Sequence, residues 1–387
     1  MKQRLSLFFI LVCLISLTAF SGCGAIQKIS DRLLHEAPTE KDTITTEKLL
    51  ADAVVAALQD GEEEVTLNIA MEEEEIAKIS SYMTPFWGRA SKYTILSEYK
   101  DLDLGSTTEP IVYKVHFTLE HSINYYVYNA YKDPNFEIPE NQPDTQAVLA
   151  ALKNVIGEIY RNRPADVVPT DYEETLAAHD WLVRNLTYDE SLSEGSKENG
   201  VVGAFLNRKT MCQGYSEALQ LILLCATNVK SDIIVGNALN SHGESIGHAW
   251  NIVLINGNWY HVDATFDDPV GNPEDSVNHY YFGQTDEVMI TNHEWNTEIW
   301  PQANAEDFLF FRASGLYADG QDAFVSIVRD LILSDPSHIA IAVTGPPFFD
   351  DQFQFIYREN PDVTNLYRGL TTVGPATIVT LNLTYRS

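Results

Sequence analysis

The dipeptide Asn-Gly at positions 256–257 constrains the fold of this chain more than any other feature. It separates two apolar, aromatic-rich runs, Ala249–Ile255 and Trp259–Phe266, which are typical of β-strands. Asn-Gly is the strongest signal for a two-residue hairpin loop, and such a loop fixes the register of its strands. In that register His248 and Asp263 are diagonal neighbours on one face, about 7–8 Å apart, within reach of an imidazole–carboxylate hydrogen bond. A loop one residue longer would turn one of these side chains to the other face.

A helix is predicted over Cys212 to about Ala226, so that Cys212 is its first residue. A cysteine at the start of a helix meets unpaired backbone N–H groups and the positive end of the helix dipole, which both favour the thiolate. Cys225 lies near the end of the same helix, about 20 Å from Cys212 at a rise of about 1.5 Å per residue, so a disulfide between them is excluded. We interpret Cys225 as a buried packing residue.

Cys212, His248 and Asp263 together predict nucleophilic catalysis. We expect Cys212 to be the nucleophile, His248 its general base and then the acid for the leaving group, and Asp263 the residue that orients the imidazole. The backbone N–H of Cys212 is a candidate oxyanion donor, and the side chains of Gln213 and Tyr188 are further candidates.

No metal site and no cofactor is predicted. We interpret the pair His261 and Asp263 as structural rather than metal-binding, and Asp267-Asp268 as a turn rather than a calcium site. Four histidines in this part of the chain are expected to be polar surface or core-edge residues: His242, His261, His279 and His293.

Short segments around these residues resemble the transglutaminase-like superfamily of papain-type cysteine enzymes. The order Cys, His, Asp matches, as do the settings at a helix start and on two successive strands. The resemblance covers Asp171–Pro269 and is carried by the following segments: Thr210–Ser216, Gly247–Asn251, Trp259–Thr265, His179–Val183, Tyr188-Asp189 and Asp267–Pro269.

The resemblance implies an α+β fold with a papain-like core, in which the helix carrying Cys212 packs on an antiparallel sheet carrying His248 and Asp263. Smaller α/β domains are expected on either side of this core. The predicted domains are 45–132, 145–300 for the transglutaminase-like domain, and 305–387, with a proline-rich linker at Asp133–Asp144.

The two outer domains show a similar pattern of elements. Helix followed by strand in Ala53–Ala70 recurs in Phe324–Val343, which suggests a shared fold. Further strands are expected at Ile123–Tyr131, which is rich in tyrosine, and at Gln354–Tyr357.

The first residues predict export. Lys2 and Arg4 precede the largely apolar run Leu5–Phe20, so residues 1–22 are expected to be a signal peptide. Phe20-Ser21-Gly22-Cys23 resembles a bacterial lipobox, although Phe20 stands where leucine is usual. We therefore expect a lipoprotein anchored to the bacterial cell membrane by lipid on Cys23, with residues 23–44 as a tether. Two alternatives are cleavage as an ordinary signal peptide without lipid, and an uncleaved membrane anchor. For an anchor the apolar run is shorter than the roughly 20 residues of a spanning helix.

The net charge restricts the partners. The chain has 25 Lys and Arg against 55 Asp and Glu, a formal charge of −30. Such a field repels phosphate backbones, so no nucleic-acid partner is expected. It also disfavours docking to anionic lipid through a basic patch.

The expected chemistry is acyl transfer at amide bonds through a thioester. Water would resolve the thioester in a peptidase or amidase, and an amine would resolve it in a cross-linking enzyme. Bacterial members of the superfamily hydrolyse more often than they cross-link, so we expect a peptidase-like enzyme acting on a protein, a peptide or a cell-wall peptide. The alternative is a non-catalytic surface-anchored module for binding or assembly.

Overall fold

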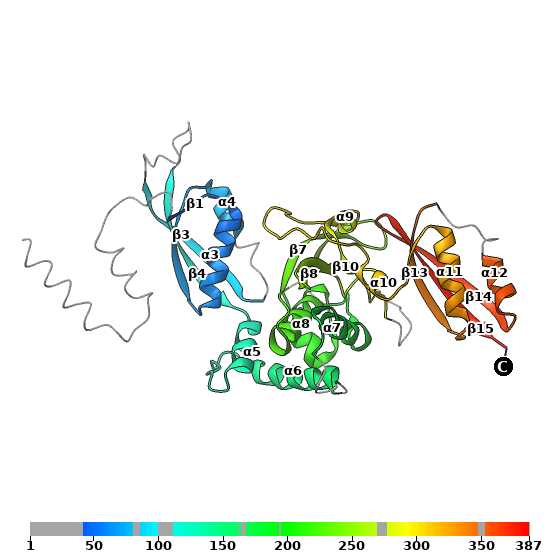
Figure 1. Cartoon of the computed structure of the whole chain (residues 1–387). Helices are drawn as coiled ribbons and strands as arrows, with labels where there is room; N and C mark the ends of the chain where they lie inside the picture. Colours follow the sequence, from blue (N-terminus) through cyan, green and yellow to red (C-terminus); the bar gives the residue numbers. More distant parts are fainter. Residues whose placement is uncertain are drawn as a thin grey trace, which may run out of the picture. The chain divides into compact units, whose positions relative to one another are not determined.

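The computed structural model describes residues 42–79, 86–99, 111–161, 163, 168–192, 195–268, 277–346 and 353–386 (Figure 1). The expected signal peptide and the tether up to residue 41 lie outside these residues, and so does Cys23. None of the helices within the described ranges is both long and apolar enough to span a membrane.

The centre of the chain folds around a five-stranded sheet with the order β10-β9-β8-β7-β11. Every neighbouring pair in this sheet is antiparallel. Its strands are β7 (Ser231–Leu239), β8 (Ser245–Ile255), β9 (Asn258–Val262), β10 (Phe282–Gln284) and β11 (His293–Glu294).

The hairpin between β8 and β9 has the predicted register. Ile255 pairs with Asn258, so positions 256–257 alone form the loop. Asn256 has φ +50° and Gly257 φ +85°, the left-handed conformations that such a loop requires. The second strand is shorter than predicted, because β9 ends at Val262 and the chain turns at Asp263.

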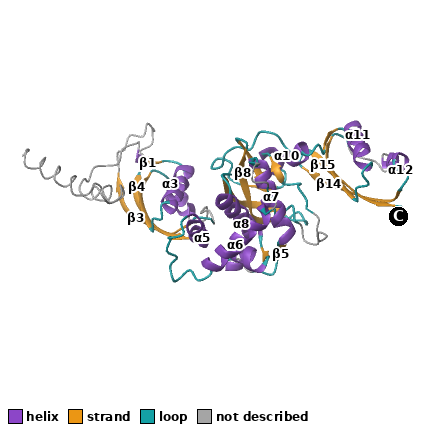
Figure 2. Ribbon diagram, turned by 60° about the horizontal axis from the view of Figure 1, so that its bottom comes forward, coloured by secondary structure: helices purple, strands orange, loops and turns teal. Residues whose placement is uncertain are grey.

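Helix α8 (Cys212–Ala226) covers one face of this sheet and begins at the predicted residue (Figure 2). Its apolar side buries Leu219 and Ile222 in one cluster with Val253 of β8. Helices α6 (Thr145–Tyr160) and α7 (Asp171–Asn185) add to the same cluster. A capping box between Thr170 and Glu173 starts α7.

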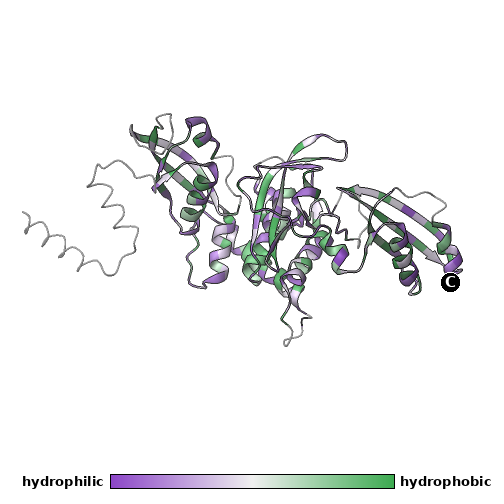
Figure 3. Cartoon of the chain, turned by 45° about the horizontal axis from the view of Figure 1, so that its top comes forward, coloured by the Kyte–Doolittle hydropathy of each residue, from purple (hydrophilic) through white to green (hydrophobic). Residues whose placement is uncertain are grey.

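The opposite face of the sheet has a core of its own. Trp250 and Ile252 of β8 lie there with Ile234 of β7 and Met289, and Trp295 packs against them. The strands of this sheet therefore bury apolar side chains on both faces, and Figure 3 shows them as largely hydrophobic.

The N-terminal and C-terminal parts each contain a four-stranded sheet of the same topology. Their strand orders are β1-β2-β4-β3 and β12-β13-β15-β14, and in each the first two strands run parallel. The N-terminal elements are β1 (Thr43–Ile44), α3 (Glu47–Gln59), β2 (Glu64–Ile69), α4 (Glu73–Lys78), β3 (Gly88–Tyr99) and β4 (Val112–His121). The C-terminal elements are β12 (Tyr317–Asp319), α11 (Gln321–Ile332), β13 (His338–Thr344), α12 (Gln354–Glu359), β14 (Val363–Val373) and β15 (Ala376–Tyr385).

Helices α11 and α12 pack on the C-terminal sheet. Phe324 and Val328 of α11 and Ile356 of α12 lie in one core with Ile341 of β13 and Leu381 of β15. Other short elements of the described residues are β5 (Thr187–Tyr188), β6 (Lys209–Thr210), α9 (Asp286–Met289), α10 (Leu309–Ala313), a 3-10 turn at Lys197–Asn199 and a π-helical turn at Gly203–Asn207.

Two predicted strands are wrong. Ile123–Tyr131 lies in α5 (Ile123–Lys132), which buries Asn124, Val127 and Ala130 at helical spacing. Gln354–Tyr357 begins α12. In both segments tertiary burial overrides the strand preference of the aromatic residues.

The predicted α+β class is confirmed: a helix that begins at Cys212 packs on an antiparallel sheet, and smaller α/β units flank this core.

Candidate active site

Cys212 lies at the first residue of α8 and is partly exposed. Strand β6 leads into this helix and pairs in parallel with β5, which carries Tyr188. A side chain at Gly214 would meet the Thr210 hydroxyl at 1.9 Å, so only glycine lets the first turn of α8 close against β6. The local sequence therefore fixes where the thiol emerges.

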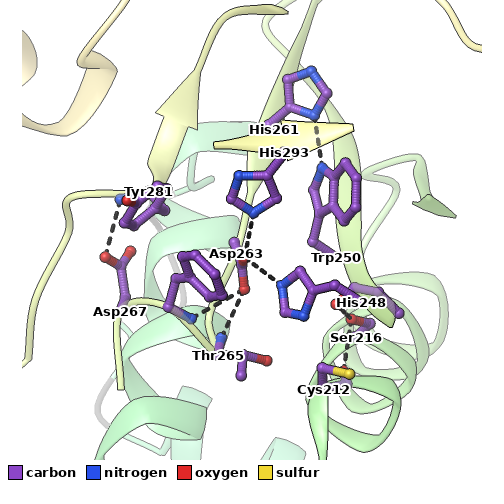
Figure 4. A network of polar contacts seen from close by, with 12 residues as sticks. Cys212, Ser216, His248, Trp250, His261, Asp263, Thr265, Asp267, Tyr281 and His293 are labelled. Atoms are coloured by element: carbon purple, nitrogen blue, oxygen red, sulfur yellow. Dashed lines mark hydrogen bonds and ion pairs between the residues drawn. The ribbon is translucent and has the colours of Figure 1, made fainter. Parts of the chain in front are cut away.

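His248 and Asp263 meet as the hairpin register predicts (Figure 4). His248 Nε2 lies 2.7 Å from Asp263 Oδ2, and both side chains are buried. His248 also hydrogen-bonds the Cys212 side chain. Because Nε2 is turned to Asp263, the ring nitrogen available to the thiol is Nδ1.

Asp263 receives hydrogen bonds on both carboxylate oxygens. The backbone N–H groups of Thr265 and Phe266 donate to Oδ1, at 3.0 and 3.1 Å. Oδ2 accepts from His248 and, at 3.1 Å, from His293 Nε2. Burial opposes the charge of Asp263, but the two histidines more than offset it and hold its pKa well below its usual range.

The electrostatics of His248 favour its charged form. Burial lowers the pKa of this imidazole, but the charge and hydrogen bond of Asp263, together with the Cys212 thiol, more than offset it. The result is a pKa raised to about 10. His248 is therefore an imidazolium at neutral pH.

Trp250 packs against the ring of His248. The two rings stack with centroids 5.7 Å apart and an angle of 18° between their planes. Trp250 Nε1–H donates to His261 Nδ1 at 2.9 Å, so His261 donates from Nε2 to Asp286 at 2.8 Å. His261, expected at the surface or core edge, is fully buried and fixes the indole ring.

The two side-chain candidates for the oxyanion site differ in their partners. Gln213 Nε2 donates to Glu217 Oε1 at 2.7 Å, so this amide is directed at its own helix. Burial and the nearby charge of Cys212 raise the pKa of Tyr188 to about 12. Tyr188 is therefore a protonated hydroxyl near the thiol.

A second histidine–aspartate network lies behind the first. His179 is fully buried, with Nε2 3.1 Å from Asp267 and Nδ1 3.3 Å from Asp180. Burial opposes its charge, but the two aspartates raise its pKa to about 9. His279 donates to Asp180 at 2.8 Å, and Arg184 pairs with Asp180 at 3.1 Å. The contact between His179 and Asp267 links α7 to the turn after β9.

Two groups of described residues bring three metal-ligand atoms within 4.8 Å of one another. One is His179, Asp180 and His279, whose donor atoms are engaged in the ion pairs above. The other is His248, Asp263 and His293, which includes two of the predicted catalytic residues.

His293 is the site residue that the sequence did not predict. It was expected at the surface or core edge, but its side chain is fully buried against Asp263. It lies on a two-residue strand with no turn or capping signal of its own, so no local sequence pattern marks this segment as part of the site.

One family profile matches the part of the chain that contains this site. The profile described as "Transglutaminase-like superfamily" matches residues 162–264. No curated protein matches the chain.

Similar solved structures are distant in sequence. One is described as a crystal structure of a TGase and is 11% identical in sequence. The similarity covers 68% of this chain and 68% of the TGase chain, with a TM-score of 0.29. A second, a proposed cysteine protease from Cytophaga hutchinsonii, is 15% identical. The similarity covers 46% of this chain and 68% of the protease chain, with a TM-score of 0.23. A third, a proposed protease from Parabacteroides distasonis, is 8% identical. The similarity covers 84% of this chain and 67% of the protease chain, with a TM-score of 0.23.

The matched residues contain Cys212, His248 and Asp263. Residues 162–264 of this chain therefore form a domain of the transglutaminase-like superfamily.

Proposed function

We propose that this protein hydrolyses amide bonds in a peptide or protein, with Cys212 as nucleophile, His248 as base and acid, and Asp263 as the residue that orients the imidazole. One observation carries the proposal. The 2.7 Å bond between His248 Nε2 and Asp263 leaves Nδ1 for the thiol, so one ring links carboxylate and sulfur.

The first half-reaction forms a thioester. The thiolate of Cys212 attacks the amide carbon, and a C–S bond forms as the carbonyl oxygen becomes an oxyanion. The C–N bond then breaks, and the imidazolium of His248 gives its Nδ1 proton to the leaving amine. Asp263 stabilises the imidazolium throughout, because its carboxylate remains charged.

The second half-reaction consumes water. Neutral His248 takes a proton from water, whose oxygen attacks the thioester carbon, and the C–S bond breaks to release the acid. The proton on His248 and the thiolate of Cys212 restore the starting ion pair. Because Cys212 is partly exposed, water can reach the thioester, which supports hydrolysis.

The oxyanion would be held by donors beside the sulfur. The first N–H groups of α8 have no partner within the helix, and the N–H of Cys212 is one of them. The protonated hydroxyl of Tyr188 is the second donor in this proposal, since Gln213 is bonded to Glu217.

A thiol-directed acyl probe on the purified protein tests the catalytic role of Cys212. We expect the probe to label the wild type at Cys212 and to leave Cys212→Ala unlabelled. Cys225 serves as an internal control, because burial raises its pKa to about 12. Absence of labelling, or equal labelling of both proteins, would contradict the proposal and favour a non-catalytic binding module. Product coupled to an added amine would instead indicate cross-linking.

We also propose that the protein is exported and held at the bacterial membrane by lipid on Cys23. The support is the sequence Phe20-Ser21-Gly22-Cys23 after an apolar run. A clickable palmitate analogue fed to expressing cells should label the wild type and not Cys23→Ser. An unlabelled wild type in a soluble fraction would exclude the anchor.

A further inference from the structure

Asp263 is shared between two histidines, and the proposed mechanism uses only one of them. His248 comes from β8 and His293 from β11, and both direct Nε2 at the same oxygen, Oδ2. Their ring centroids lie 5.5 Å apart. The carboxylate is therefore fixed between donors from two separate strands.

The fold makes room for this contact at Gly236. Strand β7 lies between β8 and β11, and Gly236 pairs with His248 across the β7–β8 ladder. A Cβ at Gly236 would meet the carbonyl oxygen of Glu294 at 2.2 Å and the ring of Trp250 at 3.2 Å. Because Gly236 has no side chain, the backbone at Glu294 can lie against β7 directly after His293, whose side chain reaches Asp263 at the end of β9.

Rings enclose His293 on several sides. Trp250 and Phe266 each have their centroid 4.8 Å from that of His293, and Tyr281 lies at 5.8 Å. The side chain is fully buried, so its orientation is set by packing and by the bond to Asp263. Its other nitrogen, Nδ1, lies 2.7 Å from the amide oxygen of Asn292, whose nitrogen donates to the Tyr281 hydroxyl.

Burial is the main influence on the pKa of His293. Burial lowers this pKa, and His248 and His261 lower it further, against the opposing effect of Asp263. The Oδ2 atom of Asp263 thus accepts one hydrogen bond from the imidazolium of His248 and a second from Nε2 of His293.

We propose that His293 is a positioning residue for the catalytic site: it holds the Asp263 carboxylate in the orientation that stabilises the imidazolium of His248. This inference rests on the proposed function and extends it to a fourth residue. His293 does not face the substrate in this scheme and acts only through Asp263.

The test measures Cys212 alkylation by iodoacetate as a function of pH in the full chain, quantified by mass spectrometry of the Cys212 peptide. Iodoacetate is an anion, so its rate reports the imidazolium beside the thiolate and needs no knowledge of the substrate. The variants are His293→Leu, which removes the donor, and His293→Gln, whose amide can donate from a position near Nε2. Thermal unfolding of each variant checks that it is folded.

We expect His293→Leu to lower the plateau rate about 10- to 100-fold, the effect of losing one hydrogen bond to a charged group. Its alkaline limb should move to lower pH, because a less ordered Asp263 stabilises the imidazolium less. His293→Gln should retain a rate and a limb close to those of the wild type. If His293→Leu does not fold, His293→Phe retains an aromatic ring in the same enclosure without a donor.

Two results would overturn the inference. If the donor-free variant and His293→Gln show the same change, His293 only fills space; if neither shows a change, Asp263 does not depend on it. A different result would overturn the proposed function, and this inference with it. In that case the Cys212 of the wild type would react no faster than a cysteine in the unfolded chain.

Discussion

At the scale of single residues, neighbouring carboxylates of the site differ in pKa because their partners differ. Asp263 is buried, yet its pKa is lowered, because two histidines and two backbone N–H groups face it. Asp268 is only partly buried, and its side chain accepts a hydrogen bond from the hydroxyl of Tyr215 at 2.6 Å. Burial raises its pKa to about 6. Opposite charge rather than exposure therefore keeps Asp263 ionised.

The raised pKa of His248 predicts the alkaline limit of activity. The imidazolium exists below about pH 10 and is lost as the pH rises through that value, so hydrolysis should persist into alkaline solution and fall near pH 10. Initial rates against pH on a peptide amide would measure this limb. Asp263→Asn should move it to lower pH and reduce the rate roughly 10⁴-fold. A wild-type limb at the unperturbed imidazole value of about 6.5 would contradict the assignment.

At the scale of elements, the site depends on one helix start and on the pairing of strands that are far apart in sequence. Helix α8 and the β8–β9 hairpin were predictable, because the apolar pattern that follows Cys212 and the Asn-Gly loop are local signals. The two-residue strand β11 was not, since its pairing with β7 is set by tertiary contacts. The helix α5 was mistaken for a strand because its tyrosines favour strands, whereas its burial follows a helical period.

Gly236 provides a test at this scale. Gly236→Ala should place a methyl group against the Glu294 carbonyl and displace β11, with a loss of about 1–3 kcal/mol in the free energy of unfolding. It should also lower iodoacetate reactivity at Cys212 in the same direction as His293→Leu. Urea unfolding and alkylation rates measure the two effects.

The matched control for this substitution lies on the next strand. A Cβ at Gly247 of β8 meets no atom within 4 Å, so Gly247→Ala should leave the free energy of unfolding nearly unchanged. Equal stabilities for Gly236→Ala and the wild type would show that β11 can yield without cost.

At the scale of the whole molecule, the predicted catalytic residues lie in one segment of the sequence. A four-stranded sheet of the same topology occurs both before and after this segment in the sequence. The sequence pattern suggested a shared fold for the outer parts, and both have the same order of helices and strands. The three predicted catalytic residues lie within the matched segment 162–264, and His293 lies beyond it. A search confined to the family's segment would therefore miss a residue that bonds Asp263.

The most direct test of the catalytic assignment is the covalent intermediate itself. The purified protein would be mixed with a peptide p-nitroanilide that it cleaves, stopped in acid, and digested for mass spectrometry. We predict the acyl mass on the peptide carrying Cys212, its absence in Cys212→Ala, and its loss on treatment with hydroxylamine, which cleaves thioesters. Nitroaniline released at the same rate by the wild type and Cys212→Ala, with no acyl group on Cys212, would contradict the account.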